Sequence, residues 1–261
     1  MLEVNKVYNM DCVEGMRLLD DCSVDLTVTS PPYDNLREYN GFDFDFEGTA
    51  KELFRVTKDG GVVVWVVGDA MVNGSETGTS FKQALFFKEC GFRLHDTMIW
   101  RKPNPFNFGS NDCYIQAFEY MFVLCKGKVK TTNFIYDREN KSGGTLIVSQ
   151  SRKGDWMQYD YQNSKYITKE YGKRHNVWDI PTSSGKGLHP AVFPEKLAQD
   201  HILSWSNEGD LVLDTFLGSG TTEIMAKESN RNYIGFEISK EYCDIAEKRL
   251  SCSNFQFQIE V

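Results

Sequence analysis

A serine, two prolines and a tyrosine, Ser30, Pro31, Pro32 and Tyr33, follow the apolar run 24–28 after the single residue Thr29. Proline lacks an N–H and fixes φ, so two consecutive prolines cannot continue a sheet ladder, and the chain should turn at the rim of a sheet. A hydroxyl, backbone carbonyls held by a rigid turn and an aromatic face could clamp a flat ring that carries an amino group. The stretch therefore predicts a nucleobase site, with an ordinary strand-to-loop transition as the alternative.

A second candidate site lies nearly two hundred residues later, in a strand, loop, helix and strand pattern. The strand 210–214 leads into a glycine-bearing loop and the helix 223–229, and the strand 233–236 ends at Glu237. In such a unit the acid at the tip of the second strand lies beside the glycine loop, where it can accept hydrogen bonds from both ribose hydroxyls of an adenosine. The alternative is a tight turn that only caps a helix.

Three adenosine-containing ligands compete for this loop. The phosphate-loop pattern Gly-Lys-Ser/Thr is missing, which disfavours a nucleoside triphosphate. A dinucleotide is disfavoured because Glu223 stands where the fingerprint requires a third glycine, and its carboxylate would repel a pyrophosphate. S-adenosylmethionine, which carries a sulfonium and no phosphate, remains, with Asp214 and the loop holding its methionine portion.

Both sites need strands that end at one edge of a sheet. The continuous β-branched run 62–67 is typical of a strand buried on both faces of a parallel sheet, and 93–100 and 118–125 are expected to pair antiparallel at one edge. The sequence thus predicts an α/β protein with a mostly parallel sheet and an antiparallel edge. Thr49 is the predicted N-cap of a helix 49–56, which Asp59, Gly60 and Gly61 should end, and the polar and aromatic segment 34–48 is a predicted loop. Further predicted elements are strands 4–10 and 24–28 and helices 13–19, 81–89, 195–205 and 240–250.

Composition excludes several classes of protein. The chain has 261 residues, 41% of them hydrophobic and 25% charged, as in ordinary globular proteins. No apolar run approaches the ~20 residues that span a bilayer, so we expect no membrane contact. Seven cysteines without a C-x-x-C pair argue against a disulfide framework and a zinc site, and the four histidines lack metal-ligand spacing. We expect no metal and a reducing, cytoplasmic location.

The net charge of −8 is unevenly distributed. Residues 126–176 contain eleven Lys or Arg and five Asp or Glu, a balance of +6 that leaves −14 for the remainder. Basic residues interleaved with aromatic residues suit contact with phosphates and bases. The alternative is a small β-insertion whose aromatic residues form its core. We divide the chain into 1–127, an inserted region 128–176 and 177–261. The aromatic residues of the insertion are Phe134, Tyr136, Trp156, Tyr159, Tyr161, Tyr166 and Tyr171.

Together these motifs resemble the amino-directed DNA methyltransferases. The run from Thr29 to Tyr33 is similar to the family's catalytic motif, and Asp214 to Thr222 to its cofactor motif, usually Asp-Pro-Phe-x-Gly-Ser-Gly-Thr. Catalytic motif first, basic insertion next and cofactor motif last is the order of the β subgroup. The segment 181–205, with its His189-Pro190 pair, resembles the element before the cofactor loop, so the likeness covers nearly the whole chain.

The resemblance implies a Rossmann-like, doubly wound fold with an inserted target-recognition region, and methyl transfer from S-adenosyl-L-methionine to an exocyclic amine in double-stranded DNA by base flipping. It implies that Ser30 and the Pro31 carbonyl accept the amine hydrogens in a turn completed by Pro32, while Tyr33 stacks on the base. Asp11 would contact the cofactor adenine, or cap the helix that follows. The implied cofactor-binding residues are Asp11, Asp214, Phe216, Gly218, Ser219, Gly220, Thr221 and Glu237.

Two positions depart from the family pattern. Thr215 replaces the usual proline, and Ser30 stands where many adenine-modifying members have Asp or Asn. In this family a serine at that position is commoner in enzymes that make N4-methylcytosine. We therefore expect methylation of cytosine at N4, with N6-adenine methylation as the alternative. A DNA- or RNA-binding module that keeps the fold without catalysis is a second alternative. A second copy of the chain and a restriction endonuclease of the same system are further candidate partners, which no stretch demonstrates.

Overall fold

The computed structural model describes residues 2–32, 44–105, 113–153, 160–183 and 194–252, with the side chains of 149–153 and 160–164 excepted. The chain forms two compact units. The first comprises Met1–Asn133 and Asn176–Val261, and the second is Phe134–His175. Residues 128–133, which we had assigned to the insertion, fall in the first unit. There Asn133 donates from its backbone N–H to the Ser204 carbonyl at 2.8 Å.

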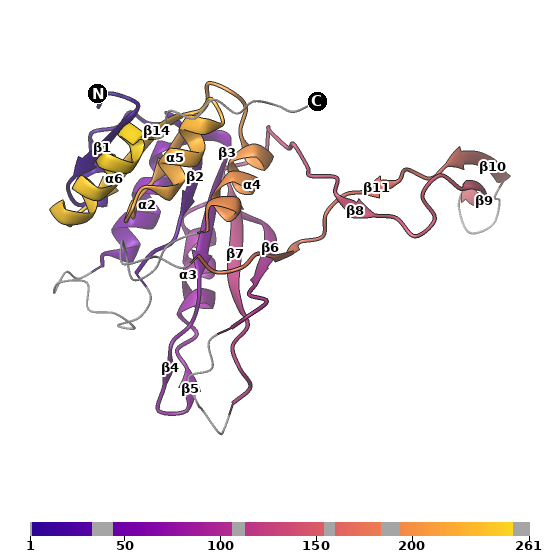
Figure 1. The fold of residues 1–261 in the computed structure, drawn as a ribbon, viewed down its shortest axis with the longest axis horizontal. Coiled ribbons are helices and arrows are strands. Elements are labelled where there is room, and N and C mark those ends of the chain that lie inside the picture. The colour runs from indigo at the N-terminus through magenta and orange to yellow at the C-terminus, as the bar shows by residue number, and fades with distance from the viewer. Residues whose placement is uncertain (1, 33–43, 106–112, 154–159, 184–193, 253–261) are drawn as a thin grey trace. The chain divides into compact units, whose positions relative to one another are not determined.

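An eight-stranded sheet forms the centre of the first unit (Figure 1). Its order is β1-β14-β13-β2-β3-β7-β6-β12. All neighbours are parallel except β7, which is antiparallel to both β3 and β6, so the predicted antiparallel pairing is confirmed. The short strand β12 adds a parallel edge outside that pair. The strands are β1 (Lys6–Asn9), β2 (Val24–Thr29), β3 (Thr57–Val67), β6 (Arg93–Arg101), β7 (Phe118–Cys125), β12 (Val177–Asp179), β13 (Leu211–Asp214) and β14 (Asn232–Glu237).

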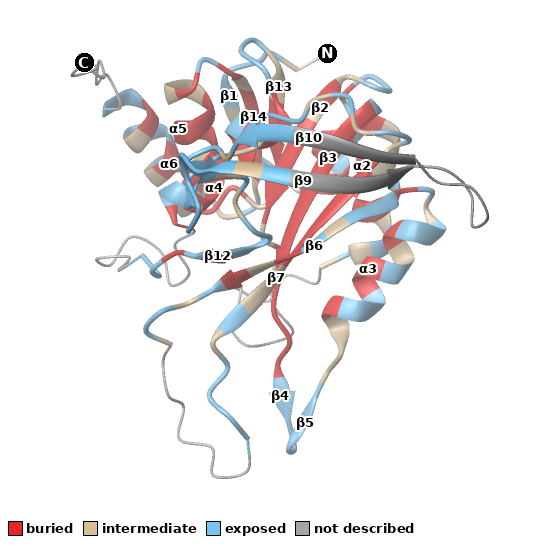
Figure 2. Ribbon diagram, turned by 90° about the vertical axis from the view of Figure 1, so that its right-hand side faces the viewer, coloured by how far each residue is buried: buried red, intermediate tan, exposed pale blue. Residues whose placement is uncertain are grey.

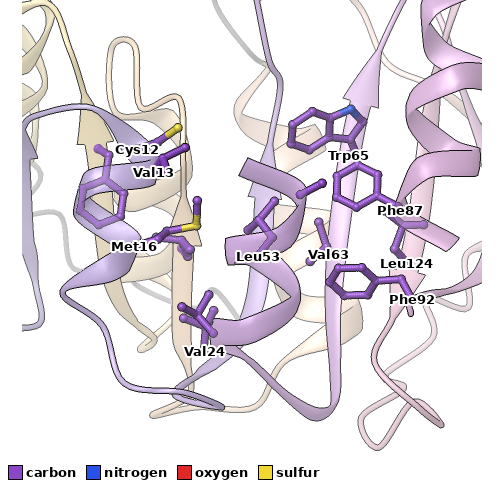
Figure 3. Packing of buried hydrophobic residues seen from close by; sticks show 14 of the residues in the cluster. Cys12, Val13, Met16, Val24, Leu53, Val63, Trp65, Phe87, Phe92 and Leu124 are labelled. Atoms are coloured by element: carbon purple, nitrogen blue, oxygen red, sulfur yellow. The ribbon is translucent and has the colours of Figure 1, made fainter. Parts of the chain in front are cut away.

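Helices cover both faces of this sheet, as Figure 2 shows. The expected doubly wound α/β fold is confirmed. On one face, α1, α2 and α3 enclose a core in which Trp65 and Phe87 are completely buried (Figure 3). The run 62–67 is at most 1% exposed, as a strand covered on both faces requires. The helices are α1 (Cys12–Arg17), α2 (Phe46–Val56), α3 (Thr79–Glu89), α4 (Glu195–Trp205), α5 (Thr221–Glu228) and α6 (Lys240–Cys252).

The start of α2 differs from the prediction. Asp45, not Thr49, is the N-cap, and its carboxylate accepts a hydrogen bond from the Gly48 N–H at 2.9 Å. Thr49 lies one turn inside the helix, where its hydroxyl donates to the Asp45 carbonyl. The predicted helix end at Val56 is correct, although Asp59 to Gly61 lie inside the next strand rather than in a separate turn. The helix ends at Val56, and β3 begins at Thr57.

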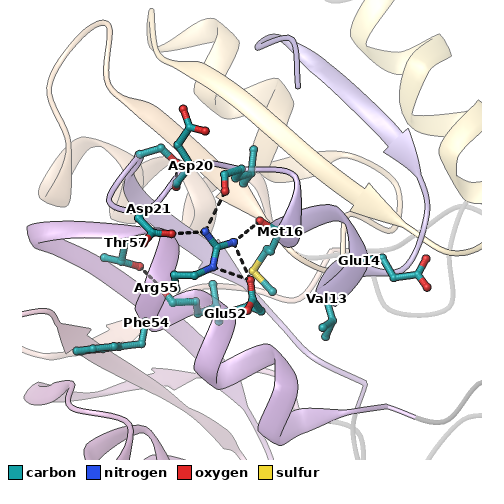
Figure 4. Close-up of polar contacts among 12 residues, drawn as sticks. Val13, Glu14, Met16, Asp20, Asp21, Glu52, Phe54, Arg55 and Thr57 are labelled. Atoms are coloured by element: carbon teal, nitrogen blue, oxygen red, sulfur yellow. Dashed lines mark hydrogen bonds and ion pairs between the residues drawn. The ribbon is translucent and has the colours of Figure 1, made fainter. Parts of the chain in front are cut away.

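One arginine joins α1 to α2. The Arg55 guanidinium donates to the Met16 carbonyl at 2.6 Å and to the Leu19 carbonyl at 2.9 Å, and pairs with Asp21 and Glu52 (Figure 4). The Met16 carbonyl lies in the last turn of α1 and also accepts the Leu19 N–H at 2.9 Å, and Leu19 lies just beyond the helix, so the cation adds to the bonds that close this helix end. Arg55 thereby ties α2 to the end of α1 and to the segment that leads into β2.

The second unit consists of two small antiparallel pairs. β8 (Arg138–Glu139) pairs with β11 (Tyr171–Gly172), and β9 (Leu146–Lys153) pairs with β10 (Asp160–Ile167). Tyr136, Tyr166 and Tyr171 are 48–56% exposed. For these three tyrosines, the alternative that the aromatic residues form a core is wrong. Across the described residues of both units, no helix is long and apolar enough to cross a membrane.

Candidate active site

The catalytic turn begins where β2 ends. Pro31 is buried, and Ser30 and Pro32 are half-buried. The prolines end the ladder as expected, because β2 stops at Thr29. Tyr33 and most of the predicted loop 34–48 lie outside the described residues, as does the pair His189-Pro190.

A hydrogen bond joins this turn to the cofactor loop. The Thr29 hydroxyl donates to Asp214 Oδ1 at 2.6 Å and lies 3.1 Å from the Thr215 hydroxyl. The two strands are neighbours, with Leu213 of β13 opposite Thr27 of β2. Motifs 185 residues apart in sequence therefore meet at the carboxyl edge of one sheet, where open α/β sheets bind ligands.

The backbone of the glycine loop is held by two acids. Asp214 accepts the Phe216 N–H at 2.9 Å, and Glu237 Oε2 accepts the Gly218 N–H at 2.9 Å. The predicted position of Glu237 beside the loop is thus correct. Glu237 Oε1 accepts the Ser239 N–H at 2.8 Å. Because each carboxylate oxygen has two lone pairs, one on each remains for a ligand, which matches the two hydroxyls of a ribose.

Arg249 of α6 holds the loop from the other side. Its guanidinium donates to the carbonyl and the hydroxyl of Ser219, the latter at 2.9 Å, and lies 3.4 Å from the Thr221 hydroxyl. Ser219, Gly220 and Thr221 are all buried. Gly220 has φ 79°, and a Cβ there would come within 2.9 Å of the Ala246 side chain, so this position needs glycine.

Three carboxyl groups lie in and under the loop. Burial raises the pKa of Asp214 and of Glu237, and the hydrogen bonds that each accepts oppose this rise. Glu223 is completely buried, and among the described residues neither of its oxygens has a hydrogen-bond partner. Burial and the nearby Asp214 charge raise the pKa of Glu223 well above its usual value. With Glu223 held neutral, Asp214 and Glu237 are the acids that can carry negative charge here, which suits a cationic ligand such as a sulfonium and disfavours a pyrophosphate.

Two remaining predicted residues lie near the same edge. Asp11 is the N-cap of α1, and its Oδ1 accepts the N–H groups of Val13 at 2.8 Å and Glu14 at 3.1 Å. The capping interpretation is therefore correct, with the helix beginning at Cys12 rather than Val13. Phe216 packs edge-on against Phe44, with ring centroids 5.0 Å apart.

Sequence reasoning missed three contributors: the Thr29 hydroxyl, Arg249 and the buried state of Glu223. Thr29 had a signal, since a hydroxyl ended the strand before the prolines. Arg249 lies one residue before the end of a predicted helix, and nothing local distinguishes it from its neighbour Lys248.

An α/β sheet of this order, with a glycine loop held by an acid at the tip of the next strand, defines the class of Rossmann-like, S-adenosyl-L-methionine-dependent methyltransferases. The chain belongs to the DNA methylase family of N6- and N4-directed enzymes, whose profile matches residues 24–248. It is therefore a site-specific DNA methyltransferase that acts on an exocyclic amine, and S-adenosyl-L-methionine is its cofactor.

Curated relatives and solved structures are similar over nearly the whole chain. The orphan methyltransferase M.BamHII of Bacillus amyloliquefaciens is 58% identical over 89% of this chain and 90% of that protein. The type II methyltransferase M.SmaI of Serratia marcescens is 28% identical over 94% and 90%. A Thermus thermophilus protein solved in complex with S-adenosyl-L-methionine superposes with a TM-score of 0.66 at 25% identity, covering 96% of this chain and 95% of that chain.

Proposed function

We propose that this enzyme methylates the N4 amine of cytosine in duplex DNA, with the target base flipped into a pocket formed by Ser30, Pro31, Pro32 and Tyr33. The observation that carries the proposal is Ser30 at the end of β2, directly after the residue that bonds Asp214. A serine there offers one short hydroxyl in place of the carboxylate or amide of many adenine-directed relatives.

The exocyclic amine is a poor nucleophile because its lone pair is delocalised into the ring. In the proposed mechanism the Ser30 hydroxyl oxygen and the Pro31 carbonyl accept the two amine hydrogens, which localises the lone pair toward the methyl donor. Tyr33 stacks on the base. S-adenosyl-L-methionine, when bound, supplies an electrophilic methyl group. The chain itself contributes positioning and hydrogen bonds, and needs no covalent cysteine.

The cofactor-binding roles follow from the loop. We propose that Glu237 accepts the ribose hydroxyls, Asp11 contacts the adenine, and Asp214 with Phe216, Gly218, Ser219, Gly220 and Thr221 holds the methionine portion. Support comes from the free lone pairs of Glu237 and the position of Asp11 two residues after Asn9, which is paired with Glu237. Asp11 Oδ1 is used by the helix cap, so Oδ2 would be the atom that meets the adenine amine.

We propose that the second unit, Phe134–His175, contacts the DNA around the target. Residues 134–175 contain eight Lys or Arg and five Asp or Glu, a balance of +3, and the tyrosines Tyr136, Tyr166 and Tyr171 are exposed rather than packed inside the unit. Cations near phosphates and aromatic faces near bases are the groups that such contact uses. A base inside a duplex cannot reach the pocket, so the target must be flipped out.

Product analysis tests the proposed base. The purified protein is incubated with unmethylated duplex DNA and S-adenosyl-L-methionine, and the DNA is digested to nucleosides and identified by mass. N4-methylcytosine is expected. N6-methyladenine would keep the mechanism but show that Ser30 does not report the base. If neither product appears across varied DNA sequences, while calorimetry still shows cofactor binding, RNA substrates and a non-catalytic binding module come next.

The question of a partner endonuclease and the location of the protein belong to the same proposal. The 58% identical relative is named an orphan methyltransferase, which favours a solitary enzyme over one paired with a restriction endonuclease. Comparing methylation of the host chromosome with and without the gene, in cells free of a matching nuclease, tests this. We also propose a cytoplasmic location, because all seven cysteines are free thiols.

A further inference from the structure

A short β-hairpin projects from the carboxyl edge of the sheet, beside the catalytic turn. β2 and β3 are neighbours whose pairing ends with Thr29 opposite Trp65. Beyond β3 the chain forms β4 (Met71–Val72) and β5 (Ser75–Glu76), which extend away from the sheet in both Figure 1 and Figure 2. The hairpin thus leaves the sheet at the edge that carries Ser30.

The hairpin is narrow and firmly held at its base. Asn73 and Gly74 have φ of 51° and 78°, the conformation of a two-residue type I′ turn. The Thr77 N–H donates to the Ala70 carbonyl at 3.0 Å, which closes the base. Asp69 is 6% exposed, and its carboxylate accepts the Ser80 N–H at 2.9 Å at the start of α3. The tip is therefore presented in one orientation.

Two exposed apolar side chains, Met71 and Val72, lie directly before the uncharged Asn73-Gly74 turn at the tip, with Glu76 opposite Met71 further from the tip. Met71 and Val72 are 45% and 52% exposed, and residues 70–75 include no charged side chain. Nothing in the described first unit covers them. A tip without charge can enter a stack of bases without the cost of removing a charge from water, which a Lys or Glu at the turn would incur.

We propose that the hairpin tip, with Met71 and Val72, enters the base stack at the target and fills the space that the flipped base leaves. This rests on the proposed base flipping. Duplex DNA is the occupant because the same edge carries the turn that receives the target base. The major groove admits a two-stranded ribbon, and methionine is among the side chains that wedge between base steps. The wedge would offset part of the unstacking cost of flipping.

The test compares two substrates. The recognition sequence is first mapped from wild-type products on plasmid DNA. The double variant Met71→Ala/Val72→Ala is then compared with wild type under single-turnover conditions on a paired duplex and on one whose target base faces an abasic site. On the paired duplex we expect the variant rate to fall about tenfold, because the flipped state loses the wedge. A tenfold fall corresponds to about 1.36 kcal/mol of activation free energy. On the abasic duplex, where flipping costs less, we expect a rate within about twofold of wild type.

Controls separate the other outcomes. Leu18→Ala removes a side chain that is 51% exposed at the end of α1, far from the carboxyl edge of the sheet, and should match wild type on both duplexes. An equal loss on both duplexes would overturn the wedge and assign the tip a structural role, or, if a dimer is also lost in gel filtration, contact with a second copy. No loss on either duplex would likewise overturn it. A wild-type protein inactive on all DNA would instead refute the proposed function.

Discussion

At the scale of single residues, the site depends on groups whose neighbours set their chemistry. Ser30 follows the threonine that bonds Asp214, so its hydroxyl is held by the same turn that ends β2. Glu223 is an acid enclosed between the loop and the Gly235 backbone, where a Cβ on Gly235 would meet its Oε1 at 2.5 Å. We propose that the first residue acts on the target base, and we expect the second to affect the stability of the protein.

Replacing Ser30 by alanine should lower turnover strongly and leave cofactor affinity within about threefold, because in the proposed mechanism the Ser30 hydroxyl accepts a hydrogen bond from the target amine and does not hold the cofactor. Removing one positioned hydrogen bond of this kind costs about a hundredfold in rate. Single-turnover methylation and calorimetric titration of S-adenosyl-L-methionine measure the two effects. Unchanged turnover would show that Ser30 does not contact the reacting amine.

Glu223→Gln should stabilise the protein at pH 8 and flatten its pH dependence. The pKa of Glu223 is raised in the folded state, so its contribution to stability is complete below its ordinary pKa of about 4.3 and declines as pH rises above that value. The decline amounts to at most about 1.4 kcal/mol per pH unit, and glutamine cannot ionise. Thermal unfolding from pH 5 to pH 8 measures it, with the exposed Glu14→Gln as control. Parallel curves for Glu223→Gln and wild type would contradict a buried neutral acid.

At the scale of elements, the cofactor loop is held by hydrogen bonds from β13, β14 and α6. Strand tips supply the acids that hold its N–H groups, and α6 supplies the cation that holds a carbonyl. The loop therefore depends on a helix that follows it by about twenty residues of chain. A change on α6 should be felt by the cofactor without touching it.

Arg249→Met should weaken S-adenosyl-L-methionine binding about tenfold, because the loop loses charged hydrogen bonds worth about 1.5–3 kcal/mol each and its glycines gain freedom. Lys248→Met removes the same charge from the preceding position of α6, which is exposed, and serves as the matched control. Isothermal calorimetry measures both. Equal affinities for the two variants would show that α6 does not position the loop.

Elements with strong local signals were predictable, and those set by distant contacts were not. The helix Glu195–Trp205 follows from Pro194 and its apolar spacing, and β3 follows from its β-branched run. The N-cap role of Asp45 was not predicted, because Phe46 resembles a residue of the aromatic loop before it. The ring of Phe46 packs against Trp65 and Phe87, and the second of these contacts depends on α3. Likewise, the motifs predicted a nucleobase and an adenosine site, but not the Thr29 to Asp214 bond that joins them.

At the scale of the whole molecule, the chain forms two units, and both predicted sites lie in the first. The first holds both motifs and the hairpin β4–β5, and the second is an excursion from Phe134 to His175. Near its origin, the Arg174 N–H donates to the Ile135 carbonyl at 2.9 Å, so the two connecting segments run side by side. The second unit should therefore be removable.

Replacing residues 134–175 by a short Gly-Ser linker should leave the first unit folded and able to bind S-adenosyl-L-methionine, since none of the proposed cofactor residues lies in the excised part. DNA affinity should fall, and the dependence of binding on salt should become shallower because cations are lost. Calorimetry and DNA binding at low and at physiological salt measure these effects. An unchanged salt slope would place the DNA contacts in the first unit.

The pairing of β2 with β13 also has a consequence for synthesis on the ribosome. The hydrogen bond between Thr29 and Asp214 cannot form until Asp214 has been synthesised, 185 residues later. At translation rates of about 5–20 residues per second this delay is roughly 10–40 s. Until then the apolar strand β2 lacks its partner β13 on one side, and sheets built from such distant pairings form slowly. A nascent chain can therefore expose the catalytic motif but cannot modify the chromosome before its last strands have been made.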